Sequence, residues 1–173
     1  MNSEIKVIKS DGSKVDIDLE KIHKMVEKSC RKITGVSESL VEMNSGLQFY
    51  DGITTQEIQK ILVKSASDLI SLESPNYQFV AARLLLFAVQ KQVFNTKWKD
   101  AEIYPSLRDI VERNVEKGLY TKDLLKDYTE EEYTKLNSYL RHSRDYEFTY
   151  AGLQQVVDKY LIQDSSTGTL FET

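Results

Sequence analysis

The sequence predicts a mainly helical α+β protein, in which an N-terminal β-hairpin is followed by a bundle of about four helices, then by further helices and a C-terminal hairpin. Three observations carry this prediction. Apolar and polar residues alternate around an Asp-Gly pair near the N-terminus, apolar residues then recur at helical spacing, and between residues 77 and 94 they become almost continuous. With 173 residues, 40% of them hydrophobic, the chain is long enough to bury a sizeable core.

The expected hairpin consists of two alternating runs around a polar turn at residues 9–13. Its apolar members are Ile5, Val7, Val15 and Ile17. The turn contains Asp11-Gly12, and Asp-Gly between alternating runs is typical of a tight hairpin connection. We therefore expect two antiparallel strands at the start of the chain.

Four helices are expected after the hairpin. Asp18, Ser37 and Thr54 are residue types that cap helix N-termini, and Pro75 suits the first turn of the fourth helix. The expected apolar faces are Leu19, Ile22, Val26 and Cys30 in the first helix, Leu40, Val41 and Leu47 in the second, and Ile58, Ile61, Leu62, Leu69 and Ile70 in the third. The fourth helix is apolar nearly all round from 77 to 94, which predicts that it forms the buried centre of the unit.

A polar stretch from Asn95 to Asp100 predicts a boundary between a domain at residues 1–95 and a second segment at residues 96–173. The second segment is more acidic, and its helical periodicity ends close to the last residue. We expect this segment to be an incomplete helical unit.

Three helices and a closing hairpin are expected in the second segment. The helices follow Tyr104-Pro105, the capping-box pattern Thr129–Glu132 and the capping residue Thr149. Their expected apolar faces are Leu107, Ile110, Val111 and Val115, then Tyr133, Leu136 and Leu140, then Leu153, Val156, Val157 and Tyr160. The hairpin would pair residues 160–163 with 169–172.

Composition excludes several classes of function. With 23 basic and 27 acidic residues, the formal net charge is −4, which does not suit a nucleic-acid-binding protein. The longest apolar run, Phe79 to Val89, is interrupted by Arg83 and is too short to cross a membrane. The N-terminal residues alternate apolar with charged side chains, unlike a signal peptide. We expect a cytoplasmic protein with no nucleic-acid or membrane partner.

No catalytic or metal-binding constellation emerges from the reactive residues. Cys30 is the single cysteine, which excludes an internal disulfide, a structural zinc cluster and dithiol chemistry within this chain, and its place on an apolar stripe predicts a small buried hydrophobe. His23 and His142 are far apart in sequence. Glu130–Glu132 are best explained as acidic residues at a helix N-terminus. We expect no catalytic residue, no metal ligand and no redox cofactor in this chain.

Basic residues suggest a binding site for an anion. Lys9 lies at the hairpin turn, whose backbone amides can form a concave set of donors. Thr55 lies in the first turn of a helix, where unpaired amides favour phosphate, and Lys91 lies near the end of the buried helix. Together they suggest a phosphate-bearing ligand between the hairpin and the helices.

The first helix also has a cationic edge. It consists of Lys21, Lys24, Lys28 and Lys32, at spacings of three and four. Because Glu20 and Glu27 interleave with it, this edge alone is interpreted as a solvated face.

Several stretches then match a known family. The stretches 7–13 (VIKSDGS) and 17–22 (IDLEKI) resemble the opening of an ATP-cone, and so do 48–55 (QFYDGITT) and 75–84 (PNYQFVAARL). The similarity continues through residues 118–120, 127–132, 144–150, 159–161 and 167–168. The combination resembles the N-terminal part of the large subunit of class Ia ribonucleotide reductases, of bacterial or T4-like phage type.

The resemblance implies allosteric regulation. In this family the cone binds ATP, which turns overall activity on, or dATP, which turns it off, with Mg²⁺. The nucleotide-binding residues that the resemblance implies are Lys9, Val15, Asp16, Ile17, Asp18, Leu19, Glu20, Lys21, Thr55 and Lys91. Ser10 stands where an arginine is frequent and Gln59 where a histidine is common in bacterial members, and both departures would weaken phosphate contacts.

The resemblance also implies partners that lie outside this chain. The family's chemistry uses a thiyl radical, a redox-active cysteine pair in an α/β barrel and C-terminal cysteines, which a chain with one cysteine does not supply. We therefore expect no catalysis by this chain alone. The implied partners are the reductase small (beta) subunit, the remainder of the large subunit, and other cones in a cone-mediated oligomer.

Two alternatives remain. In the first alternative the cone is degenerate: it no longer binds nucleotide and acts as a protein docking module. The residues Ser10 and Gln59 would favour this alternative. The other is a cone-bearing repressor of reductase genes, but such proteins carry a zinc ribbon, and this sequence has no Cys-x-x-Cys pair.

Overall fold

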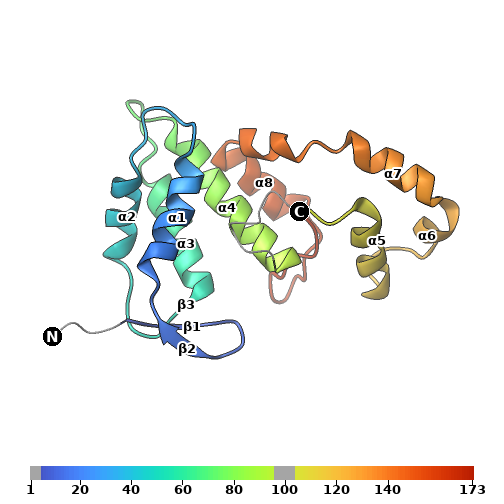
Figure 1. Cartoon of the computed structure of the whole chain (residues 1–173), viewed down its shortest axis with the longest axis horizontal. Coiled ribbons are helices and arrows are strands. Elements are labelled where there is room, and N and C mark those ends of the chain that lie inside the picture. The colour runs from blue at the N-terminus through green and yellow to red at the C-terminus, as the bar shows by residue number, and fades with distance from the viewer. Residues whose placement is uncertain (1–4, 96–103) are drawn as a thin grey trace.

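The computed structural model describes residues 5–95 and 104–173, and the predicted mainly helical α+β fold with an N-terminal hairpin is confirmed (Figure 1). In chain order its elements are β1 (Lys6–Ile8), β2 (Lys14–Asp16), α1 (Leu19–Cys30), α2 (Glu38–Gly46), β3 (Ile53–Thr54), α3 (Thr55–Ser67), α4 (Tyr77–Phe94), α5 (Leu107–Glu116), α6 (Asp123–Asp127), α7 (Glu130–Tyr139), the 3₁₀ helix η2 (His142–Glu147) and α8 (Tyr150–Lys159).

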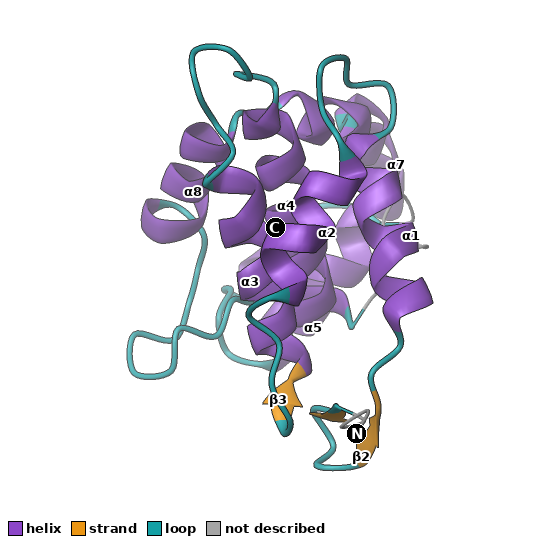
Figure 2. Ribbon diagram, turned by 90° about the vertical axis from the view of Figure 1, so that its left-hand side faces the viewer, coloured by secondary structure: helices purple, strands orange, loops and turns teal. Residues whose placement is uncertain are grey.

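The hairpin is part of a three-stranded sheet with the order β2-β1-β3. β1 pairs antiparallel with β2, with Val7 opposite Val15, and parallel with β3, with Ile8 opposite Thr54. β3 was not predicted, because two residues are too few for an alternating pattern. The strands lie at one end of the helices, where α1 and α3 begin and α4 ends (Figures 1 and 2).

The N-caps predicted in the second segment, Thr129 and Thr149, both accept a hydrogen bond from the first turn of their helix. Of the four helix starts predicted in the first segment, two are confirmed by hydrogen bonds. The Asp18 carboxylate accepts a bond of 2.8 Å from the amide of Lys21. Thr54 and Glu57 form a complete capping box, in which the Glu57 amide donates to Thr54 Oγ1 over 3.1 Å and the Thr54 amide donates to Glu57 Oε2 over 2.8 Å. These bonds fix where α1 and α3 start relative to the sheet.

The two other predicted helix starts differ from expectation. Ser37 makes no side-chain cap bond, and its amide instead donates to the hydroxyl of Tyr77 over 2.8 Å. Pro75 lies in a turn, and α4 begins two residues later, at Tyr77. Tyr77 is therefore both the first residue of α4 and the anchor of the loop before α2.

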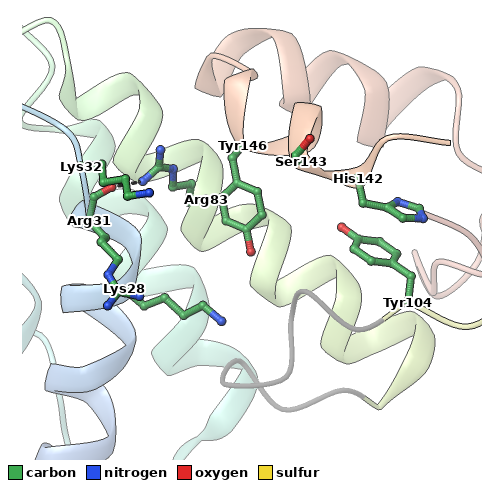
Figure 3. Close-up of a pocket in the computed structure, with 8 residues that line it drawn as sticks. All are labelled: Lys28, Arg31, Lys32, Arg83, Tyr104, His142, Ser143 and Tyr146. Atoms are coloured by element: carbon green, nitrogen blue, oxygen red, sulfur yellow. Dashed lines mark hydrogen bonds between the residues drawn. The ribbon is translucent and has the colours of Figure 1, made fainter.

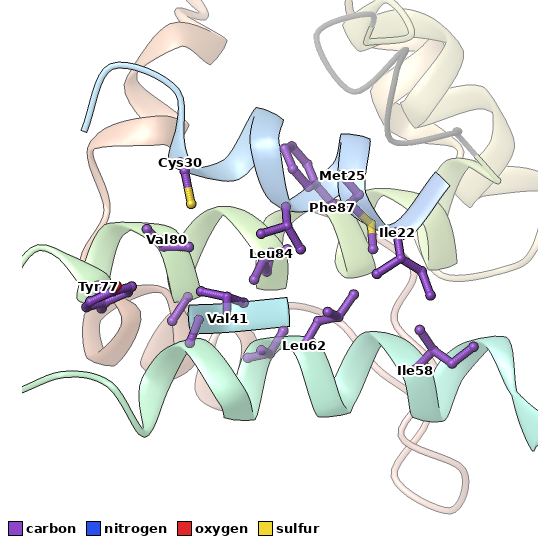
Figure 4. Close-up of a cluster of buried hydrophobic side chains, with 14 of the residues drawn as sticks. Ile22, Met25, Cys30, Val41, Ile58, Leu62, Tyr77, Val80, Leu84 and Phe87 are labelled. Carbon is purple, nitrogen blue, oxygen red and sulfur yellow. The ribbon is translucent and has the colours of Figure 1, made fainter. Parts of the chain in front are cut away.

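α4 is the buried centre of the molecule, as predicted. On one side it packs against α1 and α3, and on the other against α8 and η2. The core on the first side, shown in part in Figure 4, includes Ile22, Met25, Val26, Cys30, Val41, Ile58, Leu62, Tyr77, Val80, Leu84 and Phe87. On the second side, Ala82 and Leu86 of α4 meet Leu153 of α8. A helix covered on opposite sides must be apolar nearly all round, which explains its sequence.

Some residues expected on apolar faces are instead exposed. They are Leu19, Leu40, Leu47, Ile70, Leu136, Leu140 and Tyr160. Leu19 is the first residue of α1, and the buried face of that helix is completed by Met25 and Ser29 instead. In α2 only Val41 and Ser45 are buried. Helical spacing predicted which side of each helix is apolar. It did not predict which residues on that side are covered by neighbouring elements.

The second segment contacts the first through α4 and the C-terminal residues. α8 lies beside α4, and α5, α6 and α7 lie beyond it, on the side away from α2 (Figure 1). Arg113 of α5 donates to the carbonyls of Val93 and Phe171 over 3.1 and 2.9 Å. This arginine ties the end of α4 to the C-terminal stretch.

The boundary expected at Asn95 to Asp100 lies, apart from Asn95, outside the described residues. α6 and η2 were not predicted, because five or six residues are too few for a clear period. The closing hairpin is reduced to a turn with one antiparallel bridge, between Gln163 and Leu170. Within the described ranges no helix is both long and apolar enough to span a membrane.

Candidate functional site

The parallel pairing of β1 and β3 brings two predicted site residues to one edge of the sheet. Ile8 and Thr54 are partners, and Lys9 and Thr55 follow them directly. Because parallel strands run in the same direction, the chain leaves both at the same edge. Lys9 is exposed there, and Thr55 is half-buried as the first residue of α3.

The hairpin turn uses three of its own backbone amides. The amide of Lys9 donates to the carbonyl of Ser13, and that of Gly12 to the carbonyl of Lys9, both over 2.9 Å. The amide of Ser13 donates to the Asp11 carboxylate over 2.9 Å, and the hydrogen bonds from Ser13 lower the pKa of Asp11. With three amides used inside the turn, its contribution to an anion site is the Lys9 ammonium group.

The N-terminus of α3 holds a carboxylate within its capping box. Glu57 accepts hydrogen bonds from Thr54 and, over 2.9 Å, from the hydroxyl of Tyr50, and the bonds from Thr54 lower its pKa. The amides of Thr55 and Gln56, in the first turn, have no partner within the helix. The capping box therefore orders this terminus beside the edge of the sheet.

Lys21 and Lys91 form a pair of like charges near this end of the molecule. Lys91 is half-buried in the last turn of α4, and its pKa is lowered, first by burial and second by the nearby Lys21 ammonium. Across residues 5–95 and 104–173 neither lysine forms an ion pair. Two lysines that form no ion pair within these residues favour the binding of an anion at this end of the molecule.

The carboxylates between Lys9 and Lys21 are already engaged. Their partners are Lys6 Nζ for Asp16, the Lys21 amide for Asp18, and Lys24 Nζ at 2.6 Å for Glu20. The hydrogen bond to Glu20 raises the pKa of Lys24. Because these carboxylates interact with donors of the protein, they repel an anion less than free carboxylates would.

The apolar members of the same stretch differ in exposure. Val15 and Ile17 are half-buried and pack against the core, whereas Leu19 is 62% exposed. Val15 and Ile17 therefore form an apolar edge next to the cationic residues.

The reactive residues have structural roles. Cys30 is buried, and burial raises its pKa to about 11, as expected for a packed thiol. His23 Nδ1 lies 2.6 Å from Glu42 Oε1, and this contact raises the pKa of His23. Glu132 closes a capping box with Thr129. In the part of the chain that is described, no three His, Cys, Asp or Glu side chains are grouped to hold a metal ion.

Comparisons with known proteins identify the family of this chain. A family model described as ATP cone domain matches residues 5–92, about half of the chain. The chain is 41% identical over 173 residues to the ribonucleoside-diphosphate reductase 1 subunit alpha of Escherichia coli strain K12. It is 39% identical to the subunit alpha of Haemophilus influenzae over 173 residues, and 40% identical to that of Enterobacteria phage T4 over 172 residues.

These alignments cover 98 to 100% of this chain but 22% of each relative. The chain therefore spans about a fifth of the length of the curated relatives it matches. The matched family model contains the three strands and the helices α1 to α4, apart from the last two residues of α4. The chain belongs to the ATP-cone domain family, and its whole length is homologous to the N-terminal part of the ribonucleoside-diphosphate reductase large subunit, alpha.

Proposed function

We propose that this chain is the overall-activity regulatory region of a ribonucleoside-diphosphate reductase large subunit. In this proposal residues 1–95 form a cone that binds ATP or dATP, and residues 96–173 are the helical start of the catalytic domain. The family match over residues 5–92 and the subunit alpha relatives support it.

One observation carries the proposal: the lysine pair at the sheet end of the bundle. The charge of Lys21 contributes, after burial, to the lowered pKa of Lys91, neither lysine forms an ion pair among the described residues, and Lys9 leaves β1 at the edge where α3 begins. The triphosphate of ATP or dATP, with Mg²⁺, would supply negative charge here. Lysine ammonium groups and the positive end of a helix dipole favour such a ligand.

The apolar edge suits the nucleoside part of the ligand. Val7 and Ile22 are buried beneath it, and Ile17 is half-exposed beside them. A base placed against these side chains would cover apolar area while the phosphates reach the lysines.

α4 offers a route from this site to the rest of the chain. Lys91 lies in its last turn, and Leu86, little more than one turn earlier, packs against α8. ATP and dATP differ by one hydroxyl, so opposite effects require that each ligand favours a different arrangement of the same packing. We propose that the packing that differs between the two ligands is that of α4 against α1, α3 and α8.

The relatives are named as reductases, and catalysis is assigned in this proposal to the rest of the large subunit. Its partners would be that remainder, the small (beta) subunit, and other cones in an oligomer. The single cysteine suits the reducing cytoplasm.

The test is thermal unfolding of the chain in magnesium buffer with and without ATP or dATP. A ligand present at 100 times its Kd stabilises by about 2.7 kcal/mol, which raises the unfolding temperature by about 5 °C or more. Lys91→Ala should abolish most of this rise, and Lys60→Ala, an exposed lysine on α3, is the matched control. No rise with either nucleotide at millimolar concentration would contradict nucleotide binding.

A docking role is the second candidate, favoured by the outer side of α2. Leu40, Met43 and Leu47 are 42%, 57% and 83% exposed there. Capture of the reductase small subunit without nucleotide, lost in Met43→Lys, would support docking. Failure of capture both with and without dATP would refute it.

A further inference from the structure

The last turn of α4, which carries Lys91, is bonded to the second segment of the chain. Gln90, which is buried, donates from its side chain to the hydroxyl of Tyr104. Gln92, the next residue after Lys91, donates to the carbonyl of Gly168 over 3.5 Å. Both partners lie outside the matched family model. Contacts from beyond the cone therefore help to fix the turn that presents Lys91.

Tyr104 is itself fixed within the second segment. Its ring stacks on that of His142, with the two centroids 3.6 Å apart and the planes 5° from parallel (Figure 3). Its hydroxyl donates to the carboxylate of Asp145 over 2.8 Å, and burial and this hydrogen bond raise the pKa of Tyr104. The bond from Gln90 thus reaches a side chain that two other contacts hold in place.

Arg113 of α5 makes the most direct contact with the end of α4. Its Nη1 donates to the carbonyl of Val93 over 3.1 Å, and its guanidinium lies 4.9 Å from the centre of the Phe94 ring. The last carbonyls of a helix have no partner within it, and they form the negative end of the helix dipole. A cation that donates to one of them stabilises the end of the helix. Arg113 therefore fixes the terminal turn of α4 from outside.

The same guanidinium holds the C-terminal stretch. Its Nη2 donates to the carbonyl of Phe171 over 2.9 Å. The stretch is ordered by other bonds as well: the amide of Phe171 donates to the carbonyl of Ile162 over 3.0 Å, and Glu172 accepts from the hydroxyl of Tyr120 over 2.5 Å. Because a guanidinium is a rigid plane, its two carbonyl partners cannot move apart without breaking one of its bonds.

We propose that Arg113 is a positioning residue for the nucleotide site. It acts on Lys91 through the last turn of α4, and it joins this turn to the C-terminal stretch at Phe171. The inference rests on the function proposed above. A turn that binds nucleotide better when Arg113 holds it must, by thermodynamic linkage, be held more tightly by Arg113 when nucleotide is bound. The nucleotide site and the C-terminal stretch are then coupled through one guanidinium.

The test measures the affinity of the 173-residue chain for ATP by calorimetry in magnesium buffer. Arg113→Gln should weaken ATP binding about fivefold or more, which is the usual size of a coupling between sites. The matched control is Arg108→Gln, because Arg108 lies on the same helix but has Glu112 and Glu130 as its partners. This control should change the affinity by less than about twofold. Equal affinity in the two folded variants would overturn the proposal.

Arg113→Lys separates positioning from charge. It keeps a cation near the end of α4, so it also serves as the test variant should Arg113→Gln fail to fold. An ammonium group does not reproduce the rigid fork that reaches two carbonyls. The affinity for ATP should therefore stay below that of the unaltered chain. Full recovery would overturn the proposal, because a cation alone would then suffice.

Amide hydrogen exchange, followed by NMR, measures the coupling itself. The amide of Phe171 is hydrogen-bonded to Ile162. Saturating ATP should slow its exchange in the unaltered chain and in Arg108→Gln, but not in Arg113→Gln. The same slowing in both variants would overturn the proposal. If the unaltered chain binds no ATP, the function proposed above fails as well, whereas ATP binding that does not depend on Arg113 refutes this inference alone.

Discussion

Ile8 and Thr54 are direct partners in the parallel pair of β1 and β3, and this one register brings Lys9 and Thr55 to the same edge of the sheet. Lys9 and Thr55 are 46 positions apart in sequence (55 − 9), and no local sequence pattern predicts that they lie near each other. The candidate site thus depends on a pairing of only two residues in β3. The predictions below test that site and the packing behind it.

Lys91→Met should stabilise the free chain and weaken its ligand. The pKa of Lys91 is lowered by burial and by Lys21, so the charged form is disfavoured in the folded state. The charged lysine therefore destabilises the folded state fully at pH values below its folded-state pKa. This effect is relieved as the pH rises towards the unfolded-state pKa of about 10.4. We expect the unfolding temperature at pH 7 to rise by about 2 °C. Affinity for ATP and dATP should fall about tenfold or more, as expected for the loss of a charge-assisted hydrogen bond.

Thermal unfolding and calorimetry on the same Lys91→Met sample check both effects. Lys60→Met, which changes an exposed lysine, should change neither quantity. Unchanged nucleotide affinity would remove Lys91 from the site.

Thr54→Ala and Thr55→Ala separate capping from binding at adjacent positions. Thr54 Oγ1 accepts from the Glu57 amide in the capping box, so its removal should lower the free energy of unfolding by about 1 kcal/mol. Thr55 has no role in the box, and its replacement should change stability by less than about 0.5 kcal/mol while weakening nucleotide binding several-fold. Urea unfolding and nucleotide titration measure the two effects. A loss of stability that is larger for Thr55→Ala would contradict the assignment.

The pair His23 and Glu42 should make stability depend on pH. The pKa of His23 is raised by its hydrogen bond to Glu42 and by the charge of that residue. Because the pKa of His23 is higher in the folded state, the contact stabilises the fold fully at pH values below the unfolded-state pKa of about 6.5. This stabilisation is lost as the pH rises through the folded-state pKa. Glu42→Gln should therefore lower the unfolding temperature at pH 5.5 and have little effect at pH 8.5. The same loss at both pH values would show that the contact acts through packing and not through charge.

Leu86→Ala and Leu153→Ala test the contact between α4 and α8. Both residues are buried in one small cluster, and each substitution should cost about 2–5 kcal/mol. Because the two side chains belong to the same cluster, the double variant should lose less than the sum, by about 0.5–3 kcal/mol. Denaturant unfolding of the four proteins gives the coupling. Strict additivity would argue against one shared cluster across the α4–α8 contact.

Much of the fold was predictable because its signals are local. The Asp11-Gly12 turn, the Asp18 cap and the Thr54 capping box each depend on residues within a few positions. The apolar character of α4 likewise predicted its central place. What failed depended on distant neighbours: Leu47 was expected on the apolar face of the second helix, but it lies just after the end of α2 and is 83% exposed.

The candidate site was predictable only in part, for the same reason. Lysine at positions 9 and 91 and threonine at position 55 suggested a phosphate ligand. The influence of Lys21 on Lys91, in contrast, depends on the packing of α1 against α4. The turn satisfies three of its own amides, which the residue types alone did not predict. The proximity of Lys28 and Lys32, on the cationic edge of the first helix, to Arg83 of the fourth was missed as well, because it too depends on the packing of α1 against α4.

The most direct test of the central claim is a calorimetric titration of the chain with ATP and with dATP in magnesium buffer. Saturable binding of both nucleotides, weakened about tenfold or more in Lys91→Ala and unchanged in Lys60→Ala, is the predicted result. A folded sample that releases no heat and gains no thermal stability with either nucleotide would contradict it.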